Sequence, residues 1–383
     1  TGYIIIDTLD VRNGEKQVVM EQLKVLVDSD KERKQTNHQL RIQSDYLTAN
    51  ISGDFQYQTL PATIQGFLHQ YLPALVEKPK QQNKQPNNVG FYAYFRELEK
   101  ITEALDMDVH FPSYPTVKGY INEEYNSLGL QAYIPKIRTS TAQMEDLTIE
   151  MNNELDALDL SVYVFNRLPK ENPTAAKIGD VKAHMNFTAR ENELDMTISL
   201  DNTDSIRNAG EIQVGALMQQ YNNKPQANIH IQPTEIVLND SIWTINESDI
   251  IYTVAEKKMD IRSFSINTDF QRIAADGIAS TDPNDSIEVE LQNIDLQYLL
   301  GYTEASKAIS VQGPLSGWAK IYGLFAQPMI EANALLPNAG LNGTYLGDVT
   351  ATAYLDREAK AIIINGEAID STNHKVVDVQ GKV

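Results

Sequence analysis

The chain has 383 residues, a formal net charge of −20 and no cysteine. A surface this acidic argues against binding to nucleic acid and against electrostatic docking on anionic lipid. The absence of cysteine excludes disulfides, thiolate chemistry and cysteine-ligated zinc. Hydrophobic residues make up 42% of the chain, enough for a substantial core. No run of about 18 apolar residues is present that would span a membrane as a helix.

A five-residue pattern recurs along the chain, with a glycine midway between two apolar, small or aromatic residues. The central glycines are Gly53, Gly119, Gly277, Gly317, Gly343, Gly366 and Gly381. In a strand, the glycine and the two outer residues share one face. The pattern therefore predicts β-segments whose packing side is hollowed at the glycine.

Strict alternation of apolar and polar residues dominates the rest of the chain. Clear runs are 23–27, 158–164, 194–200 and 287–291. One apolar and one polar face per strand is typical of antiparallel sheets. The sequence thus predicts an all-β fold: an elongated antiparallel sheet that curls into an apolar trough, with one or two short amphipathic helices.

Two segments have helical spacing instead. In 60–75 the apolar residues fall on one helical face, and Pro61 lies in the first turn. These residues are Leu60, Ile64, Phe67, Leu68, Tyr71, Leu72 and Leu75. The polar face lacks Lys and Arg, which favours packing on the sheet over lying on a membrane. A role as a plug or cap over the trough is left open. The second segment is 95–105.

Polar runs suggest where the chain divides. Residues 78–88 carry no apolar side chain except at proline, and 169–177 form a weaker break. We predict three parts: residues 1–89 with the helix 60–75, residues 90–170 with the short helix 95–105, and residues 171–383 as an extended β-trough.

No catalytic or metal-binding motif stands out. The six histidines lack H-x-x-x-H or H-E-x-x-H spacing, and there is no P-loop, dinucleotide fingerprint or G-x-S-x-G elbow. The segment 282–285 is interpreted as a β-turn rather than a calcium loop. Trp243 and Trp318 are interpreted as core or sheet-face aromatics rather than carbohydrate platforms. We therefore expect no enzyme activity, no metal and no cofactor.

The order of short motifs along nearly the whole chain resembles the TamB family, the translocation and assembly module proteins of the AsmA-like superfamily. The segments that carry the resemblance are 44–55 running into 60–73, then 117–121, 130–135, 229–233, 242–245, 261–266, 275–277, 287–300, 313–318, 328–332 and 341–348.

The resemblance implies a location and a partner. Proteins of this family are anchored in the inner membrane by an N-terminal helix, cross the periplasm of double-membrane bacteria and end at an outer-membrane barrel of the TamA type. Their body is a curled sheet with an apolar interior, thought to conduct phospholipids; an older view is that they assist outer-membrane protein assembly. We expect this chain to be an internal, periplasmic piece, with the anchor and the barrel contact outside it.

The leading interpretation is a non-catalytic module that binds or conducts phospholipid acyl chains. The predicted groove residues are Leu158, Leu160, Val162, Val164, Leu194, Met196, Ile198, Leu200, Ile287, Val289 and Leu291. Two sheets packed into a closed core would produce the same alternation, so that reading stays open. The second function is a scaffold that assists outer-membrane protein assembly by adding client strands to a sheet edge. A hydrolase on a β-scaffold has little support.

Overall fold

The computed structural model describes residues 2–14, 16–30, 37–80, 85–139, 143–167, 180–202, 206–296, 310–356 and 361–382. Strands dominate this part of the chain, and its two α-helices are α1 (Leu60–Tyr71) and α2 (Leu98–Ala104). The predicted all-β class, its antiparallel pairing and its short helices are confirmed. The curling of the sheet into a trough stays a prediction.

The described residues fall into two compact units, the first reaching residue 202 and the second starting at residue 206. The predicted boundary between residues 89 and 90 is corrected, because it falls inside strand β7 (Asn88–Phe95). The polar run before β7 connects α1 to a strand that pairs directly with β6 (Leu47–Asp54), so both sides belong to one sheet. The predicted boundary at 170/171 lies outside the described residues.

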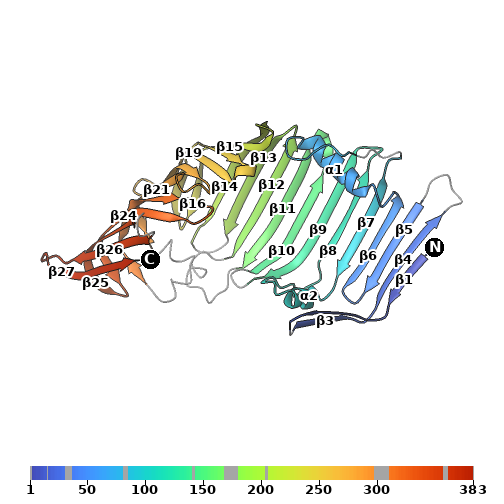
Figure 1. Ribbon diagram of the computed structural model, residues 1–383, viewed down its shortest axis with the longest axis horizontal. Coiled ribbons are helices and arrows are strands. Elements are labelled where there is room, and N and C mark those ends of the chain that lie inside the picture. The colour runs from blue at the N-terminus through green and yellow to red at the C-terminus, as the bar shows by residue number, and fades with distance from the viewer. Residues whose placement is uncertain are drawn as a thin grey trace. The chain divides into compact units, whose positions relative to one another are not determined.

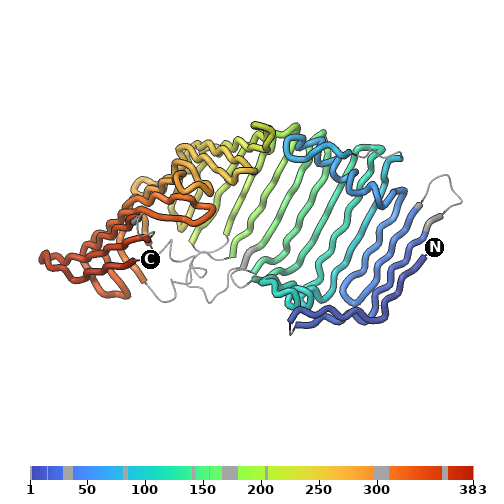
Figure 2. Tube along the Cα trace, viewed as in Figure 1, coloured from blue at the N-terminus to red at the C-terminus, as the bar shows by residue number. Residues whose placement is uncertain are grey.

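The first unit is built on one antiparallel sheet in which strands that follow one another in sequence lie side by side (Figures 1 and 2). A separate hairpin, β2 (Leu9–Asn13) and β3 (Lys16–Met20), stands between β1 and β4 in sequence. From β1 onward the strands of the sheet are β1 (Gly2–Ile6), β4 (Leu23–Asp30), β5 (Asn37–Ser44), β6, β7, β8 (Thr116–Asn122), β9 (Ser127–Arg138), β10 (Gln143–Asn152), β11 (Leu158–Arg167), β12 (Val181–Arg190) and β13 (Glu193–Asn202).

The second unit is also antiparallel. Between β14 and β19 its sheet divides: β15 and β18 pair with each other, while the hairpin of β16 and β17 pairs with β14 on one side and β19 on the other. Its strands are β14 (Ala209–Tyr221), β15 (Lys224–Ile231), β16 (Thr234–Leu238), β17 (Ser241–Ile245), β18 (Ser248–Thr253), β19 (Lys258–Asn267), β20 (Arg272–Ala279), β21 (Ser286–Asp295), β22 (Val311–Gln312), β23 (Pro314–Tyr322), β24 (Met329–Leu341), β25 (Thr344–Asp356), β26 (Ala361–Ile369) and β27 (Lys375–Lys382).

The glycines of the repeated pattern lie inside strands, as predicted, with one exception. Gly343 forms a two-residue hairpin turn with Asn342 between β24 and β25, and both residues have positive φ, 80° and 50°. This is the Asn-Gly signature of a tight hairpin. At Gly119 the expected hollow is filled, because the Phe91 ring on the paired strand would lie 2.5 Å from a Cβ atom there.

The two helices are shorter than their apolar patterns. α1 ends at Tyr71, two residues before Pro73, which lacks the N–H a further turn needs. Within this helix Ile64 is 47% exposed, so the apolar spacing overestimates the buried face, and Thr63 is buried instead. The second helix is expected from residue 95, but Phe95 is the last residue of β7, and α2 begins only at Leu98.

Candidate functional site

One face of the sheet in the first unit is apolar from strand to strand. Residues directly opposite each other in neighbouring strands share a face. Val162 of β11 lies opposite Met185 of β12, which lies opposite Ile198 of β13. One full row across the sheet is Ile4, Val25, Ile42, Ala49, Ala93, Val117, Ala132, Ile149, Val162, Met185 and Ile198.

The neighbouring row is apolar or glycine at every strand as well. It consists of Gly2, Val27, Leu40, Ile51, Phe91, Gly119, Leu130, Met151, Leu160, Phe187 and Met196. We call the surface that contains these two rows the apolar face. No charged side chain interrupts either row, so the apolar character extends through every strand of the sheet.

All eight predicted groove residues of the first unit lie on the apolar face. The alternation in β11 and β13 puts them there, and the register through β12 brings the two strands' residues into common rows. The sequence analysis missed the residues of β12 that join them, Ala183, Met185, Phe187 and Ala189. Their own alternation with Lys182, His184, Asn186 and Thr188 is a signal that was present in the sequence.

One margin of the apolar face is covered by α1. Phe67 and Tyr71 of the helix form a buried cluster with Leu128, Leu158 and Ala189 of the sheet. Ile121, Met151 and Leu194 pack against the same cluster. The predicted groove residue Leu158 is thus 9% exposed and belongs to a closed core under the helix.

Away from α1 the apolar face is less covered. Val162, Ile198 and Leu200 are half-buried, although each lies in the interior of its strand. Within the described part of the first unit, the remaining secondary structure is the β2–β3 hairpin and α2, so no second sheet packs there as in a sandwich. The two rows listed above, which we call the central rows, therefore keep part of their surface available for contact.

The opposite face of the same strands is polar and aromatic. Ser161 donates a hydrogen bond to Asn186 on the next strand, with 2.7 Å between Oγ and Oδ1. The exposed Tyr163 ring stacks on His184, with 3.9 Å between ring centroids. Because the two faces differ in this way, substitutions on the polar face can serve as controls for substitutions on the apolar face.

The three predicted groove residues of the second unit also share one face, but more of it is filled. Ile287 is 6% exposed. Leu291 packs against a buried cluster that contains Ile236, Trp243 and Ile294. Val289 is half-buried and pairs with two alanines, Ala275 and Ala319. Both tryptophans fit the prediction of core or sheet-face aromatics: Trp243 lies in the core, and Trp318 is 43% exposed on its strand.

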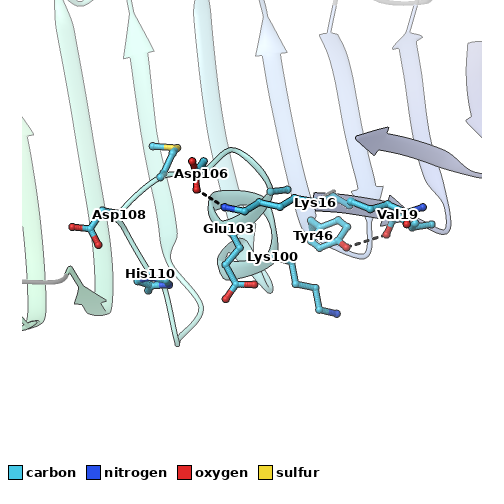
Figure 3. Close-up of a pocket in the computed structure, with 12 residues that line it drawn as sticks. Lys16, Val19, Tyr46, Lys100, Glu103, Asp106, Asp108 and His110 are labelled. Carbon is cyan, nitrogen blue, oxygen red and sulfur yellow. Dashed lines mark hydrogen bonds and ion pairs between the residues drawn. The ribbon is translucent and has the colours of Figure 1, made fainter. Parts of the chain in front are cut away.

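A cavity of about 840 Å³ lies beside α2, lined by β3, the helix and the loop after it (Figure 3). Its charges are mixed: Lys16 forms an ion pair with Asp106, and this hydrogen bond holds the pKa of the Asp106 carboxyl below its ordinary value. The Tyr46 hydroxyl donates to the Val19 carbonyl at 2.9 Å. The first contact joins the β2–β3 hairpin to the loop after α2, and the second joins it to the turn between β5 and β6.

Three potential metal ligands meet near this cavity: Glu99, Glu103 and His110, whose ligand atoms lie within 4.8 Å of one another. The spacing analysis did not predict this group, since it combines an i, i+4 pair of acids with a histidine from a loop. Glu99 lies 3.5 Å from His110 Nδ1 and 3.8 Å from Arg138, and the guanidinium of Arg138 is a cationic partner for its carboxylate.

Comparison with protein-family models, curated proteins and solved structures gave no match for this chain. Among the helices that the structure describes, none has the length and hydrophobicity needed to cross a membrane.

Proposed function

We propose that the chain is a non-catalytic module that binds acyl chains of phospholipids on the apolar face of its first unit. The observation that carries this proposal is the register: two uninterrupted apolar rows run through every strand of the sheet. In the described part of the first unit α1 covers only one margin of this face and no second sheet packs on it, and an apolar surface of this extent supports a binding role.

The energetics of such binding are favourable and unspecific. Each methylene group that leaves water contributes about 0.8 kcal/mol, so a contact of about ten carbons supplies several kcal/mol. Because successive positions along the rows are chemically similar, a bound chain has nearly equal energies at neighbouring strands. A surface of this kind supports sliding of lipid along the sheet, which is what conduction between membranes requires.

The cellular setting is part of the proposal and rests on the resemblance to the TamB family. In that setting the chain lies in the periplasm of a double-membrane bacterium. It supports outer-membrane biogenesis by passing phospholipid between the two membranes. Contacts with the inner membrane and with an outer-membrane barrel of the TamA type are then made by parts of the protein outside this chain.

The test is native mass spectrometry with lipid extraction on the chain purified without detergent from bacteria. We expect co-purified phospholipid in the unmodified chain and its loss in Val162→Asp and Ile198→Asp, which place a charge in the central row. The matched control is Thr197→Asp, one residue from Ile198 on the polar face of β13.

Three results would contradict the proposal. The first is a folded chain free of lipid. The second is equal lipid content in Ile198→Asp and Thr197→Asp when circular dichroism shows that both are folded. The third is selective unfolding. If Val162→Asp and Ile198→Asp both unfold while Thr197→Asp does not, the apolar face is a closed core rather than a groove.

The alternative, a scaffold for outer-membrane protein assembly, has one observation in its favour. In the described structure β2 and β3 pair only with each other, and their residues Leu9, Val11 and Val19 are 38%, 48% and 40% exposed. An extended client segment could add to such an edge by β-augmentation. Peptide binding that persists in Val162→Asp and Ile198→Asp would favour this alternative.

A further inference from the structure

We infer that α1 is a fixed wall along one margin of the apolar face, and that it orients a bound amphiphile with the acyl chain ends toward α1 and the headgroup at the opposite margin. This inference rests on the proposed function. It concerns the direction of the ligand on the face, and it assigns Asn87, Asn153 and Asn192 as positioning residues.

The first turn of α1 is held by Asn87, which is fully buried. Its side-chain amide donates to Thr59 at 3.0 Å and to Thr63 at 2.6 Å, and its Oδ1 accepts from the Gln56 backbone at 2.8 Å. The backbone N–H of Asn87 donates to the Glu123 carboxylate at 2.6 Å. Every polar atom of this asparagine side chain is therefore used to fix the start of the helix next to β7.

The other end of α1 is held by two further asparagines. Asn153, after β10, donates to the Tyr71 hydroxyl at 2.9 Å. Asn192, in the turn between β12 and β13, donates its backbone N–H to the Tyr71 carbonyl at 2.8 Å and accepts from the Ala74 backbone at 2.7 Å. A helix that fluctuated on and off the sheet would leave these hydrogen-bonding groups without their partners, which opposes such motion.

A wall fixed in this way has a consequence for the ligand. The helix covers the same margin of strands β8 to β13, since its cluster includes Ile121 of β8 and Leu194 of β13. The row under it is filled by Phe67 and Tyr71, so acyl chains contact the two central rows and end against apolar side chains of the helix. The asparagine side chains at this margin already bond to α1 and the residues that follow it, so they are not available to a headgroup.

The opposite margin is different in character. Two residues beyond Ile134 in β9 stands Lys136, whose ammonium forms an ion pair with Glu145 of β10 at 3.3 Å. Paired charges of opposite sign suit a zwitterionic headgroup, which carries both signs itself. We therefore assign zwitterionic glycerophospholipid as the ligand class, with its headgroup near Lys136 and Glu145.

The test uses the full unmodified chain and phosphatidylcholine that carries a photoreactive diazirine, either near the chain end or near the headgroup. Cross-linked peptides are mapped by mass spectrometry. We expect the chain-end probe to label residues 60–72 several-fold more than the headgroup probe, and the headgroup probe to label residues 134–139 and 143–147 in preference. Equal or reversed labelling by the two probes overturns the orientation while leaving lipid binding intact; no labelling by either probe removes the proposed function itself.

A double variant tests whether the asparagines at the end of α1 orient the lipid or only stabilise the helix. Asn153→Ala combined with Asn192→Gly removes the side-chain bonds at the end of α1, and glycine keeps the positive φ of 72° at position 192. We expect faster hydrogen exchange in 60–72 and loss of the difference between the two probes. The control is Asn223→Gly, at a turn with φ of 59° in the second unit. Faster exchange with an unchanged labelling difference would contradict the role of the wall.

Discussion

At the scale of single residues, the glycines of the repeated pattern do not all serve one purpose. Gly277 in β20 has a φ of 114°, and a Cβ atom there would lie 2.5 Å from the Ser286 carbonyl oxygen of the paired strand. Gly366 in β26 has no such restriction, since the nearest atom to a Cβ would be 3.9 Å away. The same sequence pattern therefore marks a backbone requirement at one site and an ordinary strand position at another.

This difference predicts opposite outcomes for one substitution. Gly277→Ala should destabilise the second unit by about 1–3 kcal/mol, because alanine is strained at this φ and collides with a backbone oxygen. Gly366→Ala should be neutral or stabilising by up to about 1 kcal/mol, because it lowers the entropy of the unfolded chain. Urea unfolding of the two variants checks the prediction, and equal destabilisation would show that the steric argument is wrong.

At the scale of elements, α1 shows how a helix is integrated into a sheet protein. Its buried side, with Phe67 and Tyr71, faces one margin of the apolar face, while Ile64 faces away. Hydrogen bonds from three asparagines fix both ends, and they come from segments before β7, after β10 and between β12 and β13. The helix thus depends on strands that follow it by many residues.

The packing of α1 predicts a contrast within the helix. Phe67→Ala should cost about 3–5 kcal/mol, since it opens a cavity against Leu128 and Leu158. Ile64→Ala, at a position 47% exposed, should change stability by no more than about 0.5 kcal/mol. Thermal unfolding with a probe of the first unit measures both. Similar losses in the two variants would mean that the buried side of α1 is misassigned.

At the scale of the whole molecule, charge and apolar surface have separate roles. The formal net charge of −20 keeps the chain dispersed and repels anionic membranes. The apolar face acts at contact distance and does not depend on charge. Under the proposed function, these two properties together would let the chain take up individual lipid molecules without adhering to the bilayer that supplies them.

The effect of ionic strength on membrane adsorption tests whether the net charge repels anionic membranes. Adsorption of the chain to phosphatidylglycerol vesicles should be weakest at low salt and increase as salt screens the repulsion, with a Debye length of about 10 Å at 0.1 M. Vesicle flotation measures the bound fraction. Adsorption that is strongest at low salt would reveal a cationic docking surface, contrary to this account.

Much of the local structure follows from the sequence. Alternation in 158–164 and 194–200 reports which side chains share a face, because the two-residue period of a strand is a property of the backbone itself. The start of α1 is encoded by Pro61 and by the change to helical spacing. The turn at Gly343 was misread as strand because Asn342-Gly343, a hairpin signal, lies between residues that continue the apolar pattern.

The sequence by itself thus determined the all-β class, the two faces of each strand and the existence of both helices. Only the tertiary structure decided that β12 aligns the residues of β11 and β13 into unbroken rows, and that α1 covers one margin of that surface. The reason is physical: register and helix placement are fixed by contacts such as that of Ala74 with Asn192, 118 residues apart in the chain. Periodicity within a segment carries no information about partners at such a distance.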